Sequence, residues 1–140
     1  MSNHSQRLLI VGGTGFIGKN LTLGCISEGY DVSVISLNEP KSNEKVRGAA
    51  YFTIDICNMN KINEKLPNNK FDYVVNLSGY VNHSNYFKGG KGIIDTHFNA
   101  VINLIDYLDK GILKKFIQIG SSDEYGSCEA PQSESMRENP

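Results

Sequence analysis

The sequence predicts an α/β fold built on a doubly wound parallel sheet of about five strands, in the order 3-2-1-4-5. Apolar or β-branched runs of strand length recur along the chain, helical or polar segments separate them, and a glycine-rich turn follows the first run. Strands that alternate with helices pair in parallel through right-handed crossovers, which places helices on both faces of the sheet.

The first half of the chain shows this alternation clearly. Arg7–Val11 is a continuous apolar run, as expected of a strand that is buried on both faces. Residues 16–28 have apolar residues at helical spacing, and Gly29 is a typical helix end. Asp31–Leu37 alternates and is β-branched, which predicts a second strand, and the polar segment Asn38–Gly48 predicts a loop.

The second half continues the pattern. Tyr51–Ile56 and Phe71–Ser78 predict the third and fourth strands, with a short helix over Asn58–Leu66 between them. The Gly- and Asn-rich segment Tyr80–Gly92 predicts an irregular loop.

A long amphipathic helix and a fifth strand follow. The helix, Ile93–Leu108, carries Phe98, Val101, Ile102, Ile105 and Leu108 on one face. Lys114–Ile119 predicts the last strand, which ends in Gly120-Ser121-Ser122. We therefore expect residues 1–126 to form one dinucleotide-binding domain and residues 127–140 to form an extended segment.

Composition excludes several classes of function. The chain has 140 residues, of which 14 are Lys or Arg and 15 are Asp or Glu, so its formal charge is −1. Without a basic face, we expect no nucleic-acid or anionic-membrane partner. The apolar runs are too short to span a bilayer. The three cysteines form no CxxC pair and suggest no metal site, which favours a reduced, cytoplasmic compartment.

The strongest functional pattern is Gly12-Gly13-Thr14-Gly15-Phe16-Ile17-Gly18, which lies between the first strand and the first helix. In this context it predicts a dinucleotide-binding loop. Gly12 permits the tight turn, Gly15 leaves space for a pyrophosphate, and Gly18 lets the helix pack closely. The helix N-terminus then attracts phosphates. The alternative is that these glycines serve only as turn residues.

The spacing Gly12-x-x-Gly15-x-x-Gly18, with Thr14, Phe16 and Ile17, resembles the extended short-chain dehydrogenase/reductase family. This family includes the NAD-dependent epimerases and dehydratases that modify sugar nucleotides. The resemblance implies a Rossmann-type fold, of which this chain is the N-terminal part and therefore incomplete. It also implies that Asp55 and Ile56 hold the adenine ring, and that Asn76-Leu77-Ser78-Gly79 forms a turn against the cofactor.

The choice of cofactor depends on the end of the second strand. An NAD enzyme of this fold normally has an acidic residue there to hold the ribose hydroxyls. Here the position is Ser36, followed by Asn38, and a serine leaves room for a 2′-phosphate. With Lys41 and Arg47 nearby in the loop, the sequence favours NADP over NAD. The alternative is that Ser36 and Asn38 bind NAD.

The segment Gly120–Gly126 resembles the family loop that carries a catalytic Ser or Thr, and the spacing puts Ser121 at that position. The resemblance implies that Ser121 hydrogen-bonds the reacting sugar oxygen; a turn serine is the alternative. Without gaps, Ser122 and Asp123 fall where 4,6-dehydratases carry Asp-Glu, so the acid position is a serine, which argues against dehydration; the alternative is a one-residue shift that brings Asp123 and Glu124 into those positions. His97 replaces an Asn of the family's helix, and either orders the active site or is an ordinary helix-face histidine.

The family's acid–base pair, Tyr-x-x-x-Lys, is missing from the sequence, because none of the seven tyrosines has a lysine four residues later. In the family that pair follows the serine loop. We therefore expect this chain to be the first part of a longer enzyme, whose substrate-binding part follows residue 140, and to be inactive by itself.

Together, these features predict the NAD(P)-binding portion of a nucleotide-sugar epimerase or ketoreductase, which transfers hydride at a sugar carbon. A 4,6-dehydratase, a reductase of a non-sugar carbonyl compound and a non-catalytic NAD(P)-binding module are the alternatives. The resemblance implies a nucleotide-sugar substrate and a homodimer that forms through the helix at Ile93–Leu108.

Overall fold

The structure is a computed structural model that describes residues 5–79 and 86–137. Five strands form one parallel sheet in the order β3-β2-β1-β4-β5, which confirms the predicted fold class. The strands are β1 (Arg7–Val11), β2 (Asp31–Ser36), β3 (Ala50–Thr53), β4 (Tyr73–Asn76) and β5 (Lys115–Gln118).

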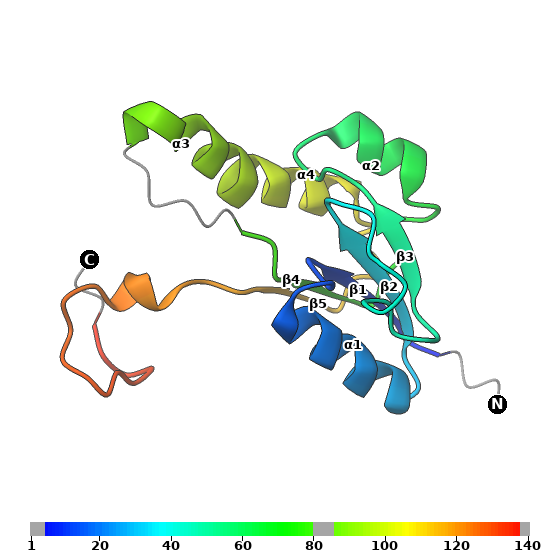
Figure 1. The fold of residues 1–140 in the computed structure, drawn as a ribbon, viewed down its shortest axis with the longest axis horizontal. Coiled ribbons are helices and arrows are strands. Elements are labelled where there is room, and N and C mark those ends of the chain that lie inside the picture. Colours follow the sequence, from blue (N-terminus) through cyan, green and yellow to red (C-terminus); the bar gives the residue numbers. More distant parts are fainter. Residues whose placement is uncertain (1–4, 80–85, 138–140) are drawn as a thin grey trace.

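Helices cover both faces of this sheet (Figure 1). Helix α1 (Phe16–Ser27) lies on one face, and Gly29 follows it with a φ of 85°. On the other side lie α2 (Met59–Lys65) and α4 (Ala100–Tyr107). Helix α3 (Tyr86–Ile94) extends beyond the sheet and leads into α4. This arrangement is the doubly wound architecture that the alternating pattern predicts.

The core consists of two clusters, one on each face of the sheet. Successive residues of β1 point to opposite faces, so Leu9 and Val11 pack with Leu104 of α4, whereas Leu8 and Ile10 pack on the α1 side. All four of these β1 side chains are buried. The apolar run of the first strand is therefore explained by burial on both faces.

The segment before α4 differs from the prediction. Helix α3 begins at Tyr86, within the segment Tyr80–Gly92 that the sequence predicted as a loop; residues 80–85 lie outside the described residues. The predicted single helix is also interrupted. A π-helical turn over Asp95–Asn99 separates α3 from α4, because the Ala100 N–H donates to the Asp95 carbonyl, five residues back.

The face of this helix that packs on the sheet was also predicted wrongly. Ala100, Leu104 and Leu108 are buried, whereas Phe98 is 64% exposed and Ile102 is 53% exposed. The segment has apolar residues on more than one side, so periodicity alone does not select the face that meets the sheet.

The strands are shorter at their carboxyl ends than the sequence predicted. β3 ends at Thr53 rather than Ile56, and β4 ends at Asn76 rather than Ser78.

In the part of the chain that the structure describes, residues 127–137 form only turns and irregular backbone. No helix of the described residues is long and apolar enough to span a membrane.

Candidate functional site

The glycine loop is held between the ends of two strands. Gly12 follows β1 with a φ of 78°, and its N–H donates to the Ile35 carbonyl of β2 at 2.8 Å. A Cβ at Gly12 would lie 3.1 Å from the backbone of Leu77 and Ser78, which follow β4. Both the positive φ and this close approach require glycine.

The other glycines of the loop fall into two groups. A Cβ at Gly18 would lie 2.4 Å from Gly13 Cα, and one at Gly13 would lie 2.6 Å from Val34 Cγ1, so both positions are closed by packing. At Gly15 the nearest such contact is 3.5 Å, to the Gly12 carbonyl oxygen, and the residue is exposed. Gly18 therefore serves close packing, while Gly15 leaves open space at the start of α1.

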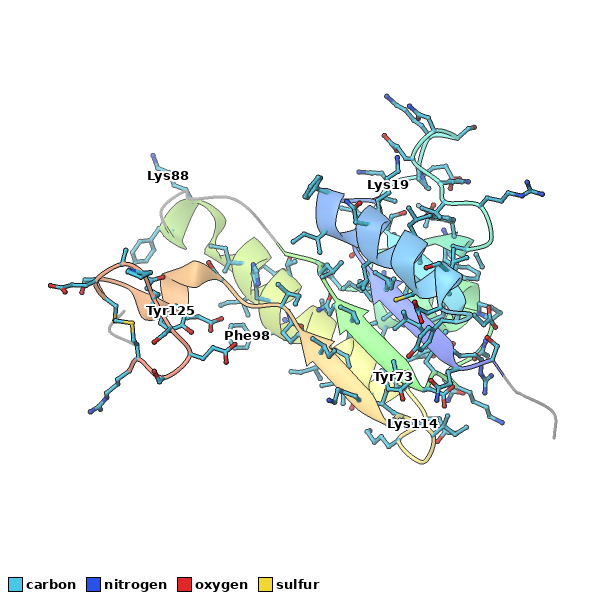
Figure 2. The ribbon with its side chains drawn as sticks, turned by 90° about the horizontal axis from the view of Figure 1, so that it is seen from below. Lys19, Tyr73, Lys88, Phe98, Lys114 and Tyr125 are labelled. Atoms are coloured by element: carbon cyan, nitrogen blue, oxygen red, sulfur yellow. The ribbon has the colours of Figure 1, made fainter. Side chains whose placement is uncertain are left out.

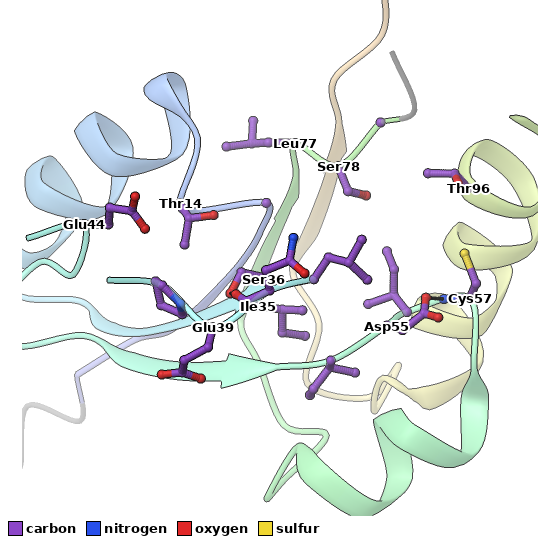
Figure 3. Close-up of a pocket in the computed structure, with 17 residues that line it drawn as sticks. Thr14, Ile35, Ser36, Glu39, Glu44, Asp55, Cys57, Leu77, Ser78 and Thr96 are labelled. Atoms are coloured by element: carbon purple, nitrogen blue, oxygen red, sulfur yellow. Dashed lines mark hydrogen bonds between the residues drawn. The ribbon is translucent and has the colours of Figure 1, made fainter. Parts of the chain in front are cut away.

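A cavity of about 660 Å³ opens at the carboxyl ends of β1, β2, β3 and β4 (Figure 3). In open α/β sheets, ligands bind in the crevice outside these ends. Most of the predicted cofactor residues line it, namely Gly12, Thr14, Ser36, Asn38, Asp55, Ile56, Leu77, Ser78 and Gly79.

Four predicted cofactor residues do not line this cavity. Gly15, Phe16, Ile17 and Gly18 form the start of α1, directly after Thr14. Phe16 is 87% exposed. The structure thus places the helix N-terminus next to the cavity without including it in the walls.

Ser36 lines the cavity at the end of β2 and is tied to the loop that follows it. Its hydroxyl donates to the Asn38 carbonyl at 2.8 Å, and the residue is buried. Lys41 and Arg47 are exposed and do not line the cavity. None of the described residues that line the cavity is a lysine, an arginine or a histidine.

Two carboxylates of the loop after β2, Glu39 and Glu44, line the cavity. The sequence analysis did not identify either of them as a site residue. Glu39 accepts hydrogen bonds from Lys45 Nζ at 2.8 Å and from Thr53 Oγ1 at 2.6 Å. The hydrogen bond from Lys45, followed by that from Thr53, lowers the pKa of Glu39 below its ordinary value. These contacts connect the loop to β3.

The end of β3 forms a tight turn at the predicted adenine position. Asp55 Oδ1 accepts the Cys57 N–H at 3.0 Å, and the Asn103 amide of α4 donates to the Ile56 carbonyl at 3.0 Å. Ile56 is buried, while Asp55 is half-buried. The apolar side chain of Ile56 and the carboxylate of Asp55 therefore lie next to each other in the cavity wall. Such a combination suits an aromatic base, which has an apolar face and polar edges.

A buried amide fixes the turn after β4. Asn76 is fully buried, its side-chain N–H₂ group donates to Gln118 Oε1 at 2.8 Å, and its Oδ1 accepts both the N–H and the hydroxyl of Ser78. This network joins β4 to β5 and sets the position of Ser78 at the cavity. Buried amides of this kind stabilise a unique local arrangement when all their groups are paired.

The predicted catalytic residues are not brought together in the cavity. Ser121 is exposed after β5, and its N–H donates to Glu124 Oε1 at 3.1 Å. His97 lies in the π-helical turn, where a Cβ at Gly79 would be 3.4 Å from its Cε1, so it borders the end of β4. The side chains of Ser122 and Asp123 lie outside the described residues. Among those described, no group of His, Cys, Asp and Glu could hold a metal.

Comparison with known proteins agrees with this geometry. Residues 8–140 match the model of the NAD dependent epimerase/dehydratase family. The chain is 26% identical, over 89% of its length, to a bifunctional UDP-glucose 4-epimerase and UDP-xylose 4-epimerase of Pisum sativum, and 29% identical, over 92%, to a UDP-N-acetyl-alpha-D-glucosaminuronate decarboxylase of Bacillus cytotoxicus. It spans about 40% of the length of these relatives.

Solved structures show the same fold. A crystal structure of a UDP-glucose 4-epimerase superposes on 96% of this chain with a TM-score of 0.80 at 19% identity, and the match covers 42% of that protein. The family match over residues 8–140 includes all five strands of the sheet, the glycine loop and the residues that line the cavity. This chain belongs to the NAD dependent epimerase/dehydratase family.

Proposed function

We propose that this chain binds a nicotinamide dinucleotide as the cofactor-binding part of an enzyme that acts on a nucleotide sugar. The observation that carries the proposal is the cavity of about 660 Å³, into which the glycine loop and the ends of β2, β3 and β4 all contribute. Family membership supports the nicotinamide cofactor, and the activities that the relatives are named for support the substrate class.

In this proposal, the cavity and the adjoining N-terminus of α1 bind different parts of the cofactor. The pyrophosphate lies beside Gly15, where no side chain blocks the backbone and the N-terminus of α1 favours negative charge. The adenine ring lies against Ile56 and Asp55. The turn Leu77–Gly79 contacts the half of the cofactor that carries nicotinamide, whose chemistry is hydride transfer.

In this proposal, catalysis by the usual route of the family depends on an acid–base pair as well as on the cofactor. Ser121 would hydrogen-bond the reacting sugar oxygen, and His97 would help to order the nearby groups. The acid–base Tyr-x-x-x-Lys pair does not occur in the sequence. We therefore expect no epimerase turnover of UDP-glucose by this chain with NAD; measurable formation of UDP-galactose would contradict this.

The reaction type that we propose is epimerisation or ketoreduction rather than dehydration. The support is the resemblance, which without gaps implies Ser122 at the position of the dehydratase acid. We also propose a homodimer. Its interface would use two exposed apolar residues, Phe98 of the π-helical turn and Ile102 of α4. Light scattering should then give twice the chain mass, and Ile102→Ser should reduce it to a monomer.

The proposed cofactor site is tested by titration of the chain with NAD and NADP in a calorimeter. Gly15→Ala should fold normally, since its Cβ makes only an ordinary contact, but should weaken dinucleotide binding about tenfold or more because the methyl group occupies the approach of the pyrophosphate. Gly24→Ala, in the middle of α1 with open space around it, is the matched control and should bind like the wild type. Absence of binding by the wild type, or equal affinities of the two variants, would contradict the proposal.

A further inference from the structure

We propose that Glu44 makes this cavity select NAD over NADP, an inference that rests on the proposed function. Glu44 belongs to the loop between β2 and β3 and lines the cavity together with Thr14 of the glycine loop. In Figure 3 its carboxylate points toward Thr14. The residue is half-buried, so its charge is only partly screened by water.

The position of Glu44 matters because of where this fold places the adenosine ribose. The ribose hydroxyls lie at the end of the second strand, and an acidic residue there normally binds them. In this chain that residue is Ser36, whose hydroxyl already donates to the Asn38 carbonyl. Three carboxylates line the cavity, and two of them, Glu39 and Glu44, belong to the loop that directly follows β2, while Asp55 follows β3.

Of these loop carboxylates, Glu44 carries the uncompensated charge. Glu39 pairs with Lys45 at 2.8 Å. Glu44 accepts the backbone N–H of Lys41 at 2.9 Å and, within residues 5–79 and 86–137, forms no ion pair. None of the described residues that line the cavity is Lys, Arg or His. A negative group that enters this part of the cavity would therefore meet a carboxylate without a compensating cation.

The loop holds Glu44 in place through its two neighbours in sequence. The carbonyl of Asn43 accepts a hydrogen bond from Lys19 Nζ of α1 at 3.1 Å. Lys45 pairs with Glu39, which is itself bound to Thr53 of β3. Because both neighbours are tied to the framework, the Glu44 backbone has little freedom to withdraw from the cavity.

The two cofactors differ at the group that would face Glu44. The 2′-hydroxyl of NAD can donate a hydrogen bond to a carboxylate, and such charge-assisted bonds are among the stronger ones. The 2′-phosphate of NADP, a monoester, carries about −1.5 to −2 charges at neutral pH. Like charges at close range in a partly enclosed site repel each other strongly. Glu44 should thus favour NAD and oppose NADP.

The experiment compares the dissociation constants of NAD and NADP for the wild type, Glu44→Gln and the matched control Glu64→Gln, which changes an exposed carboxylate of α2 away from the cavity. The wild type should bind NAD at least about tenfold more tightly than NADP. Glu44→Gln should reduce this ratio about fivefold or more, mainly through tighter NADP binding, and Glu64→Gln should leave it unchanged. Circular dichroism should show the same fold for all three.

Salt provides an independent readout. In the wild type, raising the ionic strength from about 0.05 to about 0.5 M should narrow the preference for NAD, because salt screens charge repulsion. The Glu44→Gln variant should show little change in its ratio. A wild type that binds NADP as tightly as NAD, or an unchanged ratio in Glu44→Gln, would overturn the inference and leave the proposed function standing. Absence of binding by both dinucleotides would overturn both.

Discussion

Two cavities of nearly equal volume lie at opposite ends of the same sheet. The one at the carboxyl ends of the strands has about 660 Å³ and includes the glycine loop. The other has about 650 Å³ and is lined at the amino ends by Ser5, Gln6, Arg7, Asp31, Asp72 and Lys114. Volume therefore does not distinguish a ligand site here, and the chemistry of the walls must do so.

At the amino ends, the central charged group already has partners within the protein. Asp72 accepts the Arg7 N–H at 2.9 Å and pairs with Lys114 at 2.9 Å, while Lys114 also lies 5.7 Å from the centre of the Tyr73 ring (Figure 2). These contacts connect β1, β4 and β5. At the carboxyl ends, by contrast, Gly15 leaves open space and Glu44 lacks an ion pair among the described residues. The two cavities therefore differ in the pairing of their charged groups: the carboxylate at the amino ends has a cationic partner, whereas Glu44 at the carboxyl ends has none among the described residues.

Gly18→Ala should have the largest effect on stability, because the added methyl group disrupts the packing of α1 against the glycine loop beside the carboxyl-end cavity. Its Cβ would lie 2.4 Å from Gly13 Cα and 2.7 Å from the Gly12 carbonyl oxygen, and both are backbone atoms. We expect the free energy of unfolding in urea to fall by about 3 kcal/mol. Gly15→Ala is the matched control and should change it little; equal stability of the two variants would contradict the packing role.

Asn76→Ala should have the next largest effect. The substitution leaves the N–H and hydroxyl of Ser78 without their acceptor and Gln118 without its donor. We expect a loss of about 2 kcal/mol in the free energy of unfolding, together with weaker NAD binding, because Ser78 lines the cavity. Asn20→Ala, on the exposed side of α1, should cost less than about 0.5 kcal/mol. Comparable losses in the two variants would show that the network does not stabilise this end of the sheet.

Asp72→Asn tests the amino-end cavity and should have the smallest effect. The Arg7 N–H, followed by Lys114, lowers the pKa of Asp72 in the folded protein. A carboxyl with a lowered folded pKa contributes stability above its unfolded pKa and loses it as the pH falls through the folded value. The variant should thus be slightly less stable than the wild type at neutral pH.

The difference between Asp72→Asn and the wild type should close in acid, below about pH 4. Urea unfolding at several pH values measures it. NAD affinity should remain unchanged, because Asp72 lies at the far end of the sheet. A loss of NAD affinity in this variant would contradict the assignment of the two cavities.

The sequence was sufficient for the parts of the molecule that local patterns determine. The apolar run Arg7–Val11 and the glycines after it predict β1 and the loop, since burial on both faces and tight packing leave few alternatives. Helix α3 was not predicted, because its glycines lower the intrinsic helix propensity of this segment. The segment Tyr86–Ile94 nevertheless forms a helix in the structure.

The loop that holds Glu39 and Glu44 could not be predicted from local patterns. Its position is determined by contacts with distant residues, namely Lys19 of α1 and Thr53 of β3. A polar segment without periodicity gives no sign of which side chains face a cavity. Nor does the sequence show that the Ser36 hydroxyl donates a hydrogen bond to the Asn38 carbonyl in its own loop.

The most direct test of the central claim is to map where NAD binds, from the amide chemical shifts of the labelled chain. The account predicts that NAD shifts the amides of Gly12–Thr14, Asp55–Cys57 and Leu77–Gly79 and leaves those of Arg7 and Asp72 unchanged. Shifts concentrated at Arg7, Asp72 and Lys114 would place the ligand in the amino-end cavity and contradict the account.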